Sequence, residues 1–352
     1  MKKIITVIDL GSNMIAGAVG GIGPNGTFDV VFLESIKSRG VNEGDISDLP
    51  KAVEDISRVI KKLESQARRK LKNISVSIRG SDVKLEGARG MIPLSRVSRE
   101  ITRRDVKRCI DIAGMIKIPM GRAIVQRMVK DFVIDEGSRV TNPVGLYGMK
   151  LEVESLIATA NRSKVQTISK SIDLSGLLLD GFYLSSAASA ASVLDREEKE
   201  KGVLLLDVGD SLTEGLTFRK GILEEHYKAR RGARHFKDSV GHAHPGKLHD
   251  LFEAMDPLLQ RKQGAFHSCV ITGGGALVDG MIEETEKALG LPCRIGLVRN
   301  SRIKLNSQDA IIHASTIGLI GQLAQNFVSA QPQGGSLKKT LHRLLDLYEH
   351  YF

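Results

Sequence analysis

Two stretches far apart in the chain follow the same pattern. Residues 6–20 read TVIDLGSNMIAGAVG, and residues 203–221 read VLLLDVGDSLTEGLTFRKG. Each is an apolar strand that ends in an aspartate, followed by a turn with a glycine and small polar residues, and then by a second apolar strand. Such self-similarity predicts two related halves, each of which opens with a strand, an acidic turn and a strand.

The repeated turn suits phosphate binding, although two unrelated hairpins would give the same pattern, because Asp and Gly are common in tight turns. Glycine has no side chain, so the backbone N–H groups of Gly11, Ser12 and Asn13 can approach phosphate oxygens. Asp9 and Asp207 would then hold Mg²⁺ through water, since magnesium gives up its hydration reluctantly. The two stretches alone leave both interpretations open.

A third stretch, SCVITGGGALVDGM at residues 268–281, favours the phosphate interpretation. It is a buried strand that enters Gly273, Gly274 and Gly275 and then a helix, where N–H groups can meet a phosphate or a ribose. In this order the three stretches resemble those of the actin-like ATPase superfamily. There they form the first phosphate loop, the second phosphate loop and the adenosine loop. The resemblance adds Gly209 and Thr213 to the expected nucleotide contacts.

Longer stretches resemble one family within this superfamily, the bacterial cell-division proteins called FtsA. They are SRGVNEGDISD, ITRRDVKRCIDIAGMI, NPVGLYGMKLEVESLIATA and VITGGGALVDGMIEETEKALGLPCRIG. The resemblance implies an α/β, actin-like (ribonuclease H-like) two-domain fold with an inserted small α+β module. It also implies ATP between the halves, a head-to-tail polymer of the protein, other division proteins as partners, and a place at the division site on the cytoplasmic face of the inner membrane.

The expected domain division follows from these stretches and from changes in texture along the chain. In the module, Thr102 and Asp105 are expected to cap a helix as a pair. The segments are 1–80 and 162–201 for the first actin-like domain, 81–161 for the inserted module, 202–330 for a shortened second domain, 331–336 for a flexible linker, and 337–352 for a terminal helix.

Two departures from the family pattern change the expected activity. Asp210 puts a carboxylate where phosphate oxygens are expected, and like charges about 4 Å apart repel by several kcal/mol at intermediate dielectric. ATP and Mg²⁺ binding should therefore be weakened and hydrolysis weak or absent, and no catalytic residue can be named. The segment before VITGGG is also shorter than in the family, so the fourth subdomain is expected to be reduced. In the family this subdomain binds the tubulin-like FtsZ, and whether FtsZ is a partner here stays open.

The last sixteen residues, LKKTLHRLLDLYEHYF, form an amphipathic pattern after the spacer QPQGGS. The helix is too short and polar to span a bilayer but suits an interface, although a groove on a protein would accept the same face. The glycine spacer and the family resemblance favour anionic membrane lipid. The expected lipid-facing residues are Leu337, Leu341, Leu344, Leu345, Tyr348 and Phe352.

Composition bounds the remaining classes. The 352 residues carry a formal charge of +10, which suits an anionic partner, but the basic clusters lack interleaved aromatics, so nucleic acid is not expected. Three distant cysteines offer no disulfide framework, which indicates a reducing cytosol, and no secretion signal or transmembrane run is present. His242, His244 and His249 lack a zinc pattern and are expected to lie in a polar loop.

Two other functions remain as alternatives to the division protein. One is a sugar-kinase-like ATPase or a phosphatase of the same superfamily, which would need an acidic base and a substrate cleft. The small inserted module and the tail count against such an enzyme. The other is a degenerate scaffold of the pilus-assembly type that binds no nucleotide.

Overall fold

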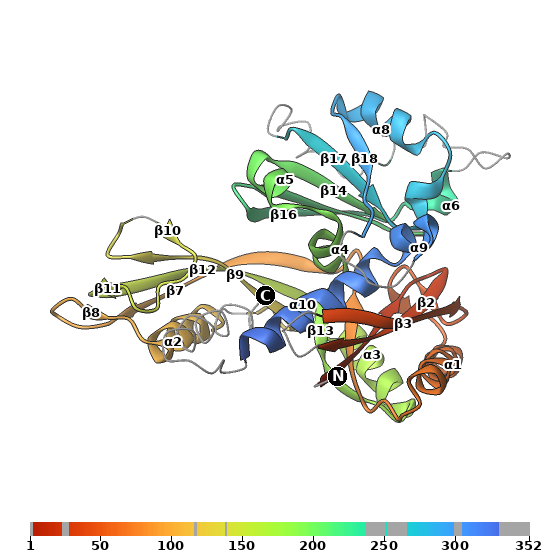
Figure 1. Ribbon diagram of the computed structural model, residues 1–352, viewed down its shortest axis with the longest axis horizontal. Helices are drawn as coiled ribbons and strands as arrows, with labels where there is room; N and C mark the ends of the chain where they lie inside the picture. Colours follow the sequence, from red (N-terminus) through yellow and green to blue (C-terminus); the bar gives the residue numbers. More distant parts are fainter. Residues whose placement is uncertain are drawn as a thin grey trace. The chain divides into compact units, whose positions relative to one another are not determined.

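The computed structural model describes residues 3–22, 28–115, 118–137, 139–236, 251, 266–298 and 305–330. The chain forms two compact units, one made of Met1–Asp82 and Ser163–Gly321, the other of Val83–Arg162 and Gln322–Phe352 (Figure 1). The predicted linker 331–336, the terminal helix 337–352 with its expected lipid-facing residues, and the histidine-rich loop 242–249 lie outside the described residues.

The first unit contains two sheets with the same topology, as the sequence repeat predicts. The first has the order β13-β6-β1-β2-β3, and the second has the order β16-β15-β14-β17-β18. In each, the opening strand pairs antiparallel with the next strand and parallel with the fourth strand of that sheet in chain order. The strands are β1 (Lys3–Leu10), β2 (Met14–Ile22), β3 (Phe28–Lys37), β6 (Asn73–Ile78) and β13 (Leu178–Leu184), and β14 (Val203–Val208), β15 (Thr213–Arg219), β16 (Ile222–Ala229), β17 (Ser268–Thr272) and β18 (Cys293–Ile295).

Helices cover these sheets, and α1 (Leu49–Ala67) forms for reasons visible in the sequence. The Asp48 side chain caps it by accepting from Lys51 N at 3.1 Å, and a proline stands in its first turn. Its apolar residues are buried against β2 and β3. The other elements of the unit are β4 (Val41–Asn42), β5 (Asp45–Ile46), α3 (Arg162–Leu174), α4 (Ser185–Val193), α5 (Arg196–Lys201), α6 (Ala233–Phe236), the 3₁₀ helix η2 (Gly274–Leu277), α8 (Met281–Leu289), α9 (Ser307–Ile312) and α10 (Ala314–Ala330).

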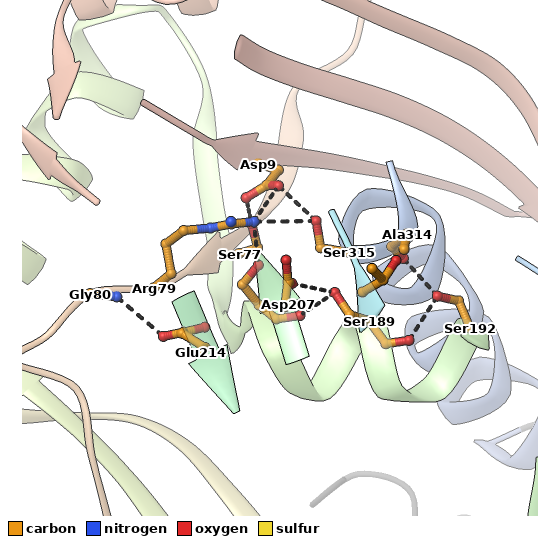
Figure 2. Close-up of polar contacts among 12 residues, drawn as sticks. Asp9, Ser77, Arg79, Gly80, Ser189, Ser192, Asp207, Glu214, Ala314 and Ser315 are labelled. Atoms are coloured by element: carbon orange, nitrogen blue, oxygen red, sulfur yellow. Dashed lines mark hydrogen bonds and ion pairs between the residues drawn. The ribbon is translucent and has the colours of Figure 1, made fainter. Parts of the chain in front are cut away.

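Small residues allow α4 to lie among four strands and another helix. Its sequence, SSAASAASV, is almost entirely buried, and it contacts β6, β13, β14 and β15, so it touches both sheets. A Cβ added at Gly318 of α10 would collide with the carbonyl of Ala188 on α4. The Ser192 hydroxyl donates to the Ala314 carbonyl at 2.8 Å, which fixes this close helix crossing (Figure 2).

The second unit is a four-stranded sheet, β10-β9-β12-β7, with α2 packed on β7 and β12 (Figure 1). The predicted capping pair is confirmed, because Thr102 and Asp105 form a capping box at the start of α2. Phe132, Val153 and Cys109 lie in its buried core. The elements are β7 (Lys84–Pro93), β8 (Arg99–Glu100), α2 (Arg103–Ala113), β9 (Arg122–Ile134), β10 (Arg139–Val140), β11 (Tyr147–Gly148) and β12 (Lys150–Asn161).

Within the described ranges, no helix has the length and apolar character needed to cross a membrane.

Candidate ligand cavity between the acidic turns

The two acidic turns and the glycine junction line one cavity in the first unit. Asp210 and His313 also line it, as does Arg79, which no sequence motif indicated. Most residues predicted to contact nucleotide are brought together here: Asp9, Gly11, Ser12, Asn13, Asp207, Gly209, Gly273 and Gly274. The two carboxylates are thus neighbours in space, although 198 positions separate them in sequence.

Thr213 and Gly275 were also predicted to contact the nucleotide, but they are not among the residues that line the cavity. Thr213 is fully buried, and its hydroxyl donates to the Arg231 carbonyl at 2.8 Å. Gly275 packs against the side chain of Val208, where an added Cβ would collide. Both residues support the turn and the junction from behind.

Each acidic turn is closed by the same backbone hydrogen bond. Gly11 N donates to Met14 O at 3.1 Å, and Gly209 N donates to Leu212 O at 2.9 Å. A Cβ at Gly11 would lie 2.6 Å from the Met14 carbonyl oxygen, and one at Gly209 would lie 2.9 Å from that of Leu212. Glycine is therefore required by the tightness of both turns, whether or not a phosphate is bound.

The two turns touch each other through serine hydroxyls. Ser12 Oγ and Ser211 Oγ lie 2.7 Å apart, at hydrogen-bond distance. Ser12 Oγ also accepts from the backbone N–H of Glu43 at 2.9 Å. The hydroxyls of the turns are therefore already paired within the protein.

Asp9 is buried and surrounded by donors (Figure 2). It accepts from Ser77 Oγ, from Ser315 Oγ at 2.7 Å and from Arg79 Nη2 at 2.8 Å. Three donors on one carboxylate satisfy most of its acceptor capacity. Asp9 thus has little capacity left to hold the water shell of a metal.

Asp207 is buried on β14 and accepts from the Ser189 hydroxyl of α4 at 2.6 Å (Figure 2). Burial raises the pKa of the Asp207 carboxyl, while the charge of Arg79 and the bond from Ser189 counteract part of that rise. Burial also disfavours the charged form of His313 and lowers the pKa of its imidazole. Burial thus acts against the charged form of both side chains at the cavity wall.

Arg79 brings the positive charge of this cavity, and it follows directly after β6. Its nearest charged neighbours include Asp207 and Glu214 besides Asp9, and these carboxylates raise the pKa of the guanidinium against the effect of burial. Arg79 Nη2 also donates to Ser185 Oγ at 2.6 Å. The repeat offered a signal that could have found it, because the fourth strand of each half, β6 or β17, also ends at the cavity.

Asp210 lines the cavity but is paired. Arg234 of α6 donates from Nε to Asp210 Oδ2 at 2.7 Å and contacts the same oxygen through Nη2. The carboxylate that was expected to repel phosphate is therefore neutralised by a neighbouring cation.

The carboxylates predicted to hold Mg²⁺ do not fit that role. A guanidinium lies against Asp9 and faces Asp207, so a positively charged group of the protein already stands beside both carboxylates (Figure 2). In the part of the chain that the structure describes, no group of three or more His, Cys, Asp or Glu residues is arranged to hold a metal ion. Magnesium chemistry is accordingly not assigned to this site.

The paired sheets and the cavity between their acidic turns define an actin-like protein. Among solved structures, the chain is similar to one in the PilM-PilN type IV pilus biogenesis complex, with 14% identity, a TM-score of 0.59, and coverage of 90% of this chain and 98% of that one. It is also similar to the ethanolamine utilization protein EutJ from Carboxydothermus hydrogenoformans, with 11% identity, a TM-score of 0.50, and coverage of 91% and 90%. At these identities the likeness concerns the fold alone.

Sequence comparison then points to one family, and the resemblance drawn from the sequence is confirmed: the chain is related to the cell-division protein FtsA. The family model described as the SHS2 domain inserted in FtsA matches residues 80–159. FtsA of Borreliella burgdorferi is 27% identical over 84% of this chain and 85% of its own length. FtsA of Pseudomonas aeruginosa is 29% identical and that of Escherichia coli K12 is 25% identical, each over 63% of this chain and 52% of its own length. The match thus spans about half the length of the latter two.

Proposed function

We propose that the chain is a division adaptor of the FtsA type, an actin-like protein that self-associates, recruits other division proteins and tethers division filaments to the inner face of the cytoplasmic membrane. The observation that carries this proposal is the inserted SHS2 domain within an actin-like body. The relatives that share the match are named as cell-division proteins. We propose the ranges 1–80, 81–161, 162–201 and 202–330 as the functional division of the body.

The second unit has the character of a contact surface. Most of the exposed large apolar side chains of the described residues belong to it, including Val97 at 74%, Tyr147 at 66% and Leu146 at 43% exposure. The backbone of Leu146 is hydrogen-bonded next to the β8 and β11 pair. Its N–H donates to the Pro143 carbonyl at 3.1 Å, and its carbonyl accepts from Ile101 N at 2.8 Å. The concentration of exposed apolar side chains on this unit supports a role for it in protein association.

Self-association through this surface is tested by substituting one exposed leucine of the second unit and, as a control, an equally exposed leucine of the first unit. Leu146 and Leu297 are each 43% exposed, but only Leu146 lies in the second unit. We expect Leu146→Asp to reduce sedimentation of polymer by about fivefold or more, since truncation at an interface core costs over 1 kcal/mol. Leu297→Asp should sediment as the unchanged chain does. Equal sedimentation of all three proteins would remove the second unit from the polymer contact.

Membrane attachment is proposed for the terminal segment 337–352, whose sequence pattern supports it. The test is co-sedimentation with vesicles that contain anionic lipid, comparing the full chain with a version that ends at Gly335. The full chain should pellet with vesicles, and the shortened chain should stay in solution. Equal pelleting would exclude this segment as the anchor. Binding to FtsZ is a separate question, which is tested with purified FtsZ.

The cavity is proposed to hold ATP as a structural ligand, with its phosphates near the amides of the two glycine turns. Backbone N–H groups of a glycine turn are suited to phosphate oxygens, and the ion pair of Asp210 with Arg234 removes much of the expected repulsion. No hydrolysis is proposed, because the carboxylates at the cavity already have protein partners. Saturable binding of a fluorescent ATP analogue is the direct test.

A second candidate is the scaffold without nucleotide, of the pilus-assembly type. The hydrogen bond between Ser12 and Ser211 favours it, since the turns are joined by their own hydroxyls. The similarity to a pilus biogenesis structure concerns fold only. Absence of saturable binding by the ATP analogue would decide for this candidate.

A further inference from the structure

The cavity contains a cation that belongs to the chain itself. The Arg79 side chain is only 14% exposed, and its Nη2 lies 2.8 Å from Asp9 Oδ2. Its Nη1 lies beside the other turn, 3.5 Å from where a Cβ of Gly209 would stand. One guanidinium therefore reaches from the carboxylate of the first half to the turn of the second half.

The internal repeat shows that the position of Arg79 does not require a long side chain. In the first sheet Asp9 pairs with Ser77, and in the second sheet Asp207 pairs with Thr272. Two residues further along stand Arg79 and Gly274, which are thus equivalent, and both line the cavity. An added Cβ at Gly274 would meet nothing within 4 Å, so that side of the cavity is open.

The backbone of Arg79 is held firmly in place. Lys164 is buried on α3 and donates from Nζ to the Arg79 carbonyl at 2.7 Å and to Asp82 at 2.9 Å. The next amide, Gly80 N, donates to Glu214 Oε1 at 3.3 Å (Figure 2). These bonds fix both ends of the peptide unit that follows Arg79, so the guanidinium is directed by a rigid support.

The carboxylates of the cavity already have cationic side chains of the protein beside them. Asp9 and Asp207 face Arg79, and Asp210 is paired with Arg234. A divalent cation placed between Asp9 and Asp207 would meet a guanidinium at close range, and two cations in a buried site repel strongly. Magnesium also requires near-ideal octahedral oxygen ligands, whereas Asp9 already accepts three hydrogen bonds.

We infer that the Arg79 guanidinium takes the place of a divalent cation in this cavity, so that ligand binding there does not depend on Mg²⁺. The exclusion of metal stands on the side chains alone. The extension to a bound nucleotide rests on the proposed function.

Metal binding is tested on the full chain with Mn²⁺, whose free concentration is followed by electron paramagnetic resonance. The unchanged protein should show no saturable site up to about 1 mM Mn²⁺, whereas Arg79→Ser should gain one site, because it frees Asp9 and opens space beside Asp207. The double variant Arg79→Ser/Asp9→Asn should lose that site again. A saturable site in the unchanged protein that Asp9→Asn abolishes would overturn the inference.

A second variant covers the case in which Arg79→Ser does not fold, since it leaves a buried carboxylate without its cation. Arg79→Gln keeps much of the volume and a donor. Its melting temperature should rise in 10 mM MgCl₂, as ligand binding to the folded state stabilises it, while that of the unchanged protein should not. A rise in the unchanged protein but not in Arg79→Gln would contradict the assignment.

Nucleotide binding distinguishes the role of Arg79 from the proposed binding of ATP. A fluorescent ATP analogue should bind the unchanged protein with dissociation constants in MgCl₂ and in EDTA that agree within about twofold. A loss of more than about tenfold in EDTA would overturn the metal-independent site. No binding in either buffer would remove ATP from the proposed function, and the Mn²⁺ titration would still decide the role of Arg79.

Discussion

Arg234 holds the carboxylate of Asp210 at the second acidic turn. Its Nε lies 2.7 Å from Asp210 Oδ2, and the backbone N–H of Arg234 donates to the Asp210 carbonyl at 3.0 Å. Ala233 N donates in turn to the Gly209 carbonyl at 2.9 Å. The start of α6 is therefore joined to the turn by side chain and backbone, and the carboxylate stays paired at the cavity wall.

This pairing predicts opposite effects of two substitutions on the binding of an ATP analogue. Asp210→Asn should strengthen binding by up to about fivefold, because it removes a negative charge near the phosphates from a partly exposed pair. Arg234→Gln should weaken it by a similar factor, since the carboxylate loses its partner. In the double variant the loss from Arg234→Gln should disappear. Equal affinities of Asp210→Asn and the unchanged protein would contradict this account.

The glycine junction after β17 provides a matched pair of substitutions. Gly273 has φ of +82°, and a Cβ there would lie 2.6 Å from the Val208 carbonyl oxygen, whereas one at Gly274 meets nothing. Gly273→Ala should lower the free energy of unfolding by about 3 kcal/mol, through backbone strain and collision. Gly274→Ala should change it by less than about 0.5 kcal/mol. Urea midpoints measure both changes. Similar losses of stability in the two variants would show that the junction does not require glycine at position 273 more than at position 274.

The fold and the position of the cavity could be predicted from the repeat. The ion pairs of the cavity could not. A strand, an acidic turn and a strand recur because each half must build the same sheet. Together with the glycine junction and the family resemblance, this repeat predicted that Asp9 and Asp207 lie at one site. Arg79 was missed because an arginine after a buried strand resembles an ordinary solvent-exposed end. The partner of Asp210, Arg234, was missed for a different reason, since a contact between residues 24 positions apart depends on how the chain turns back. The positions of Thr213 and Gly275 outside the cavity likewise depend on packing that local sequence does not encode.

Asp105 predicts a pH dependence in the second unit. Hydrogen bonds from Arg99 and Thr102 hold the pKa of its carboxyl well below the usual range, despite burial. A lowered pKa in the folded state stabilises the protein above the unfolded value of about 4, and this stabilisation is lost as the pH falls toward the folded value. Asp105→Asn should therefore cost about 2 kcal/mol at pH 7, with a smaller cost below pH 4.

The control for Asp105 is Glu100→Gln, which removes an exposed carboxylate from β8 in the same unit. Its urea midpoint should follow that of the unchanged chain at every pH. A constant difference between Asp105→Asn and the unchanged chain from pH 7 down to pH 3 would show that the charge of Asp105 contributes nothing.

The three free cysteines should differ in reactivity toward a disulfide reagent. Cys109 is buried, which raises the pKa of its thiol to about 12, and burial also raises the pKa of Cys269. Because the thiolate is the reactive form, neither should react in the folded protein, whereas Cys293 on β18 is only half-buried. Native protein should therefore release at most one equivalent of thionitrobenzoate, assigned to Cys293 by mass spectrometry, and Cys293→Ser should abolish that phase. All three should react in urea, and rapid labelling of Cys109 in the native protein would mean that the core of the second unit opens readily.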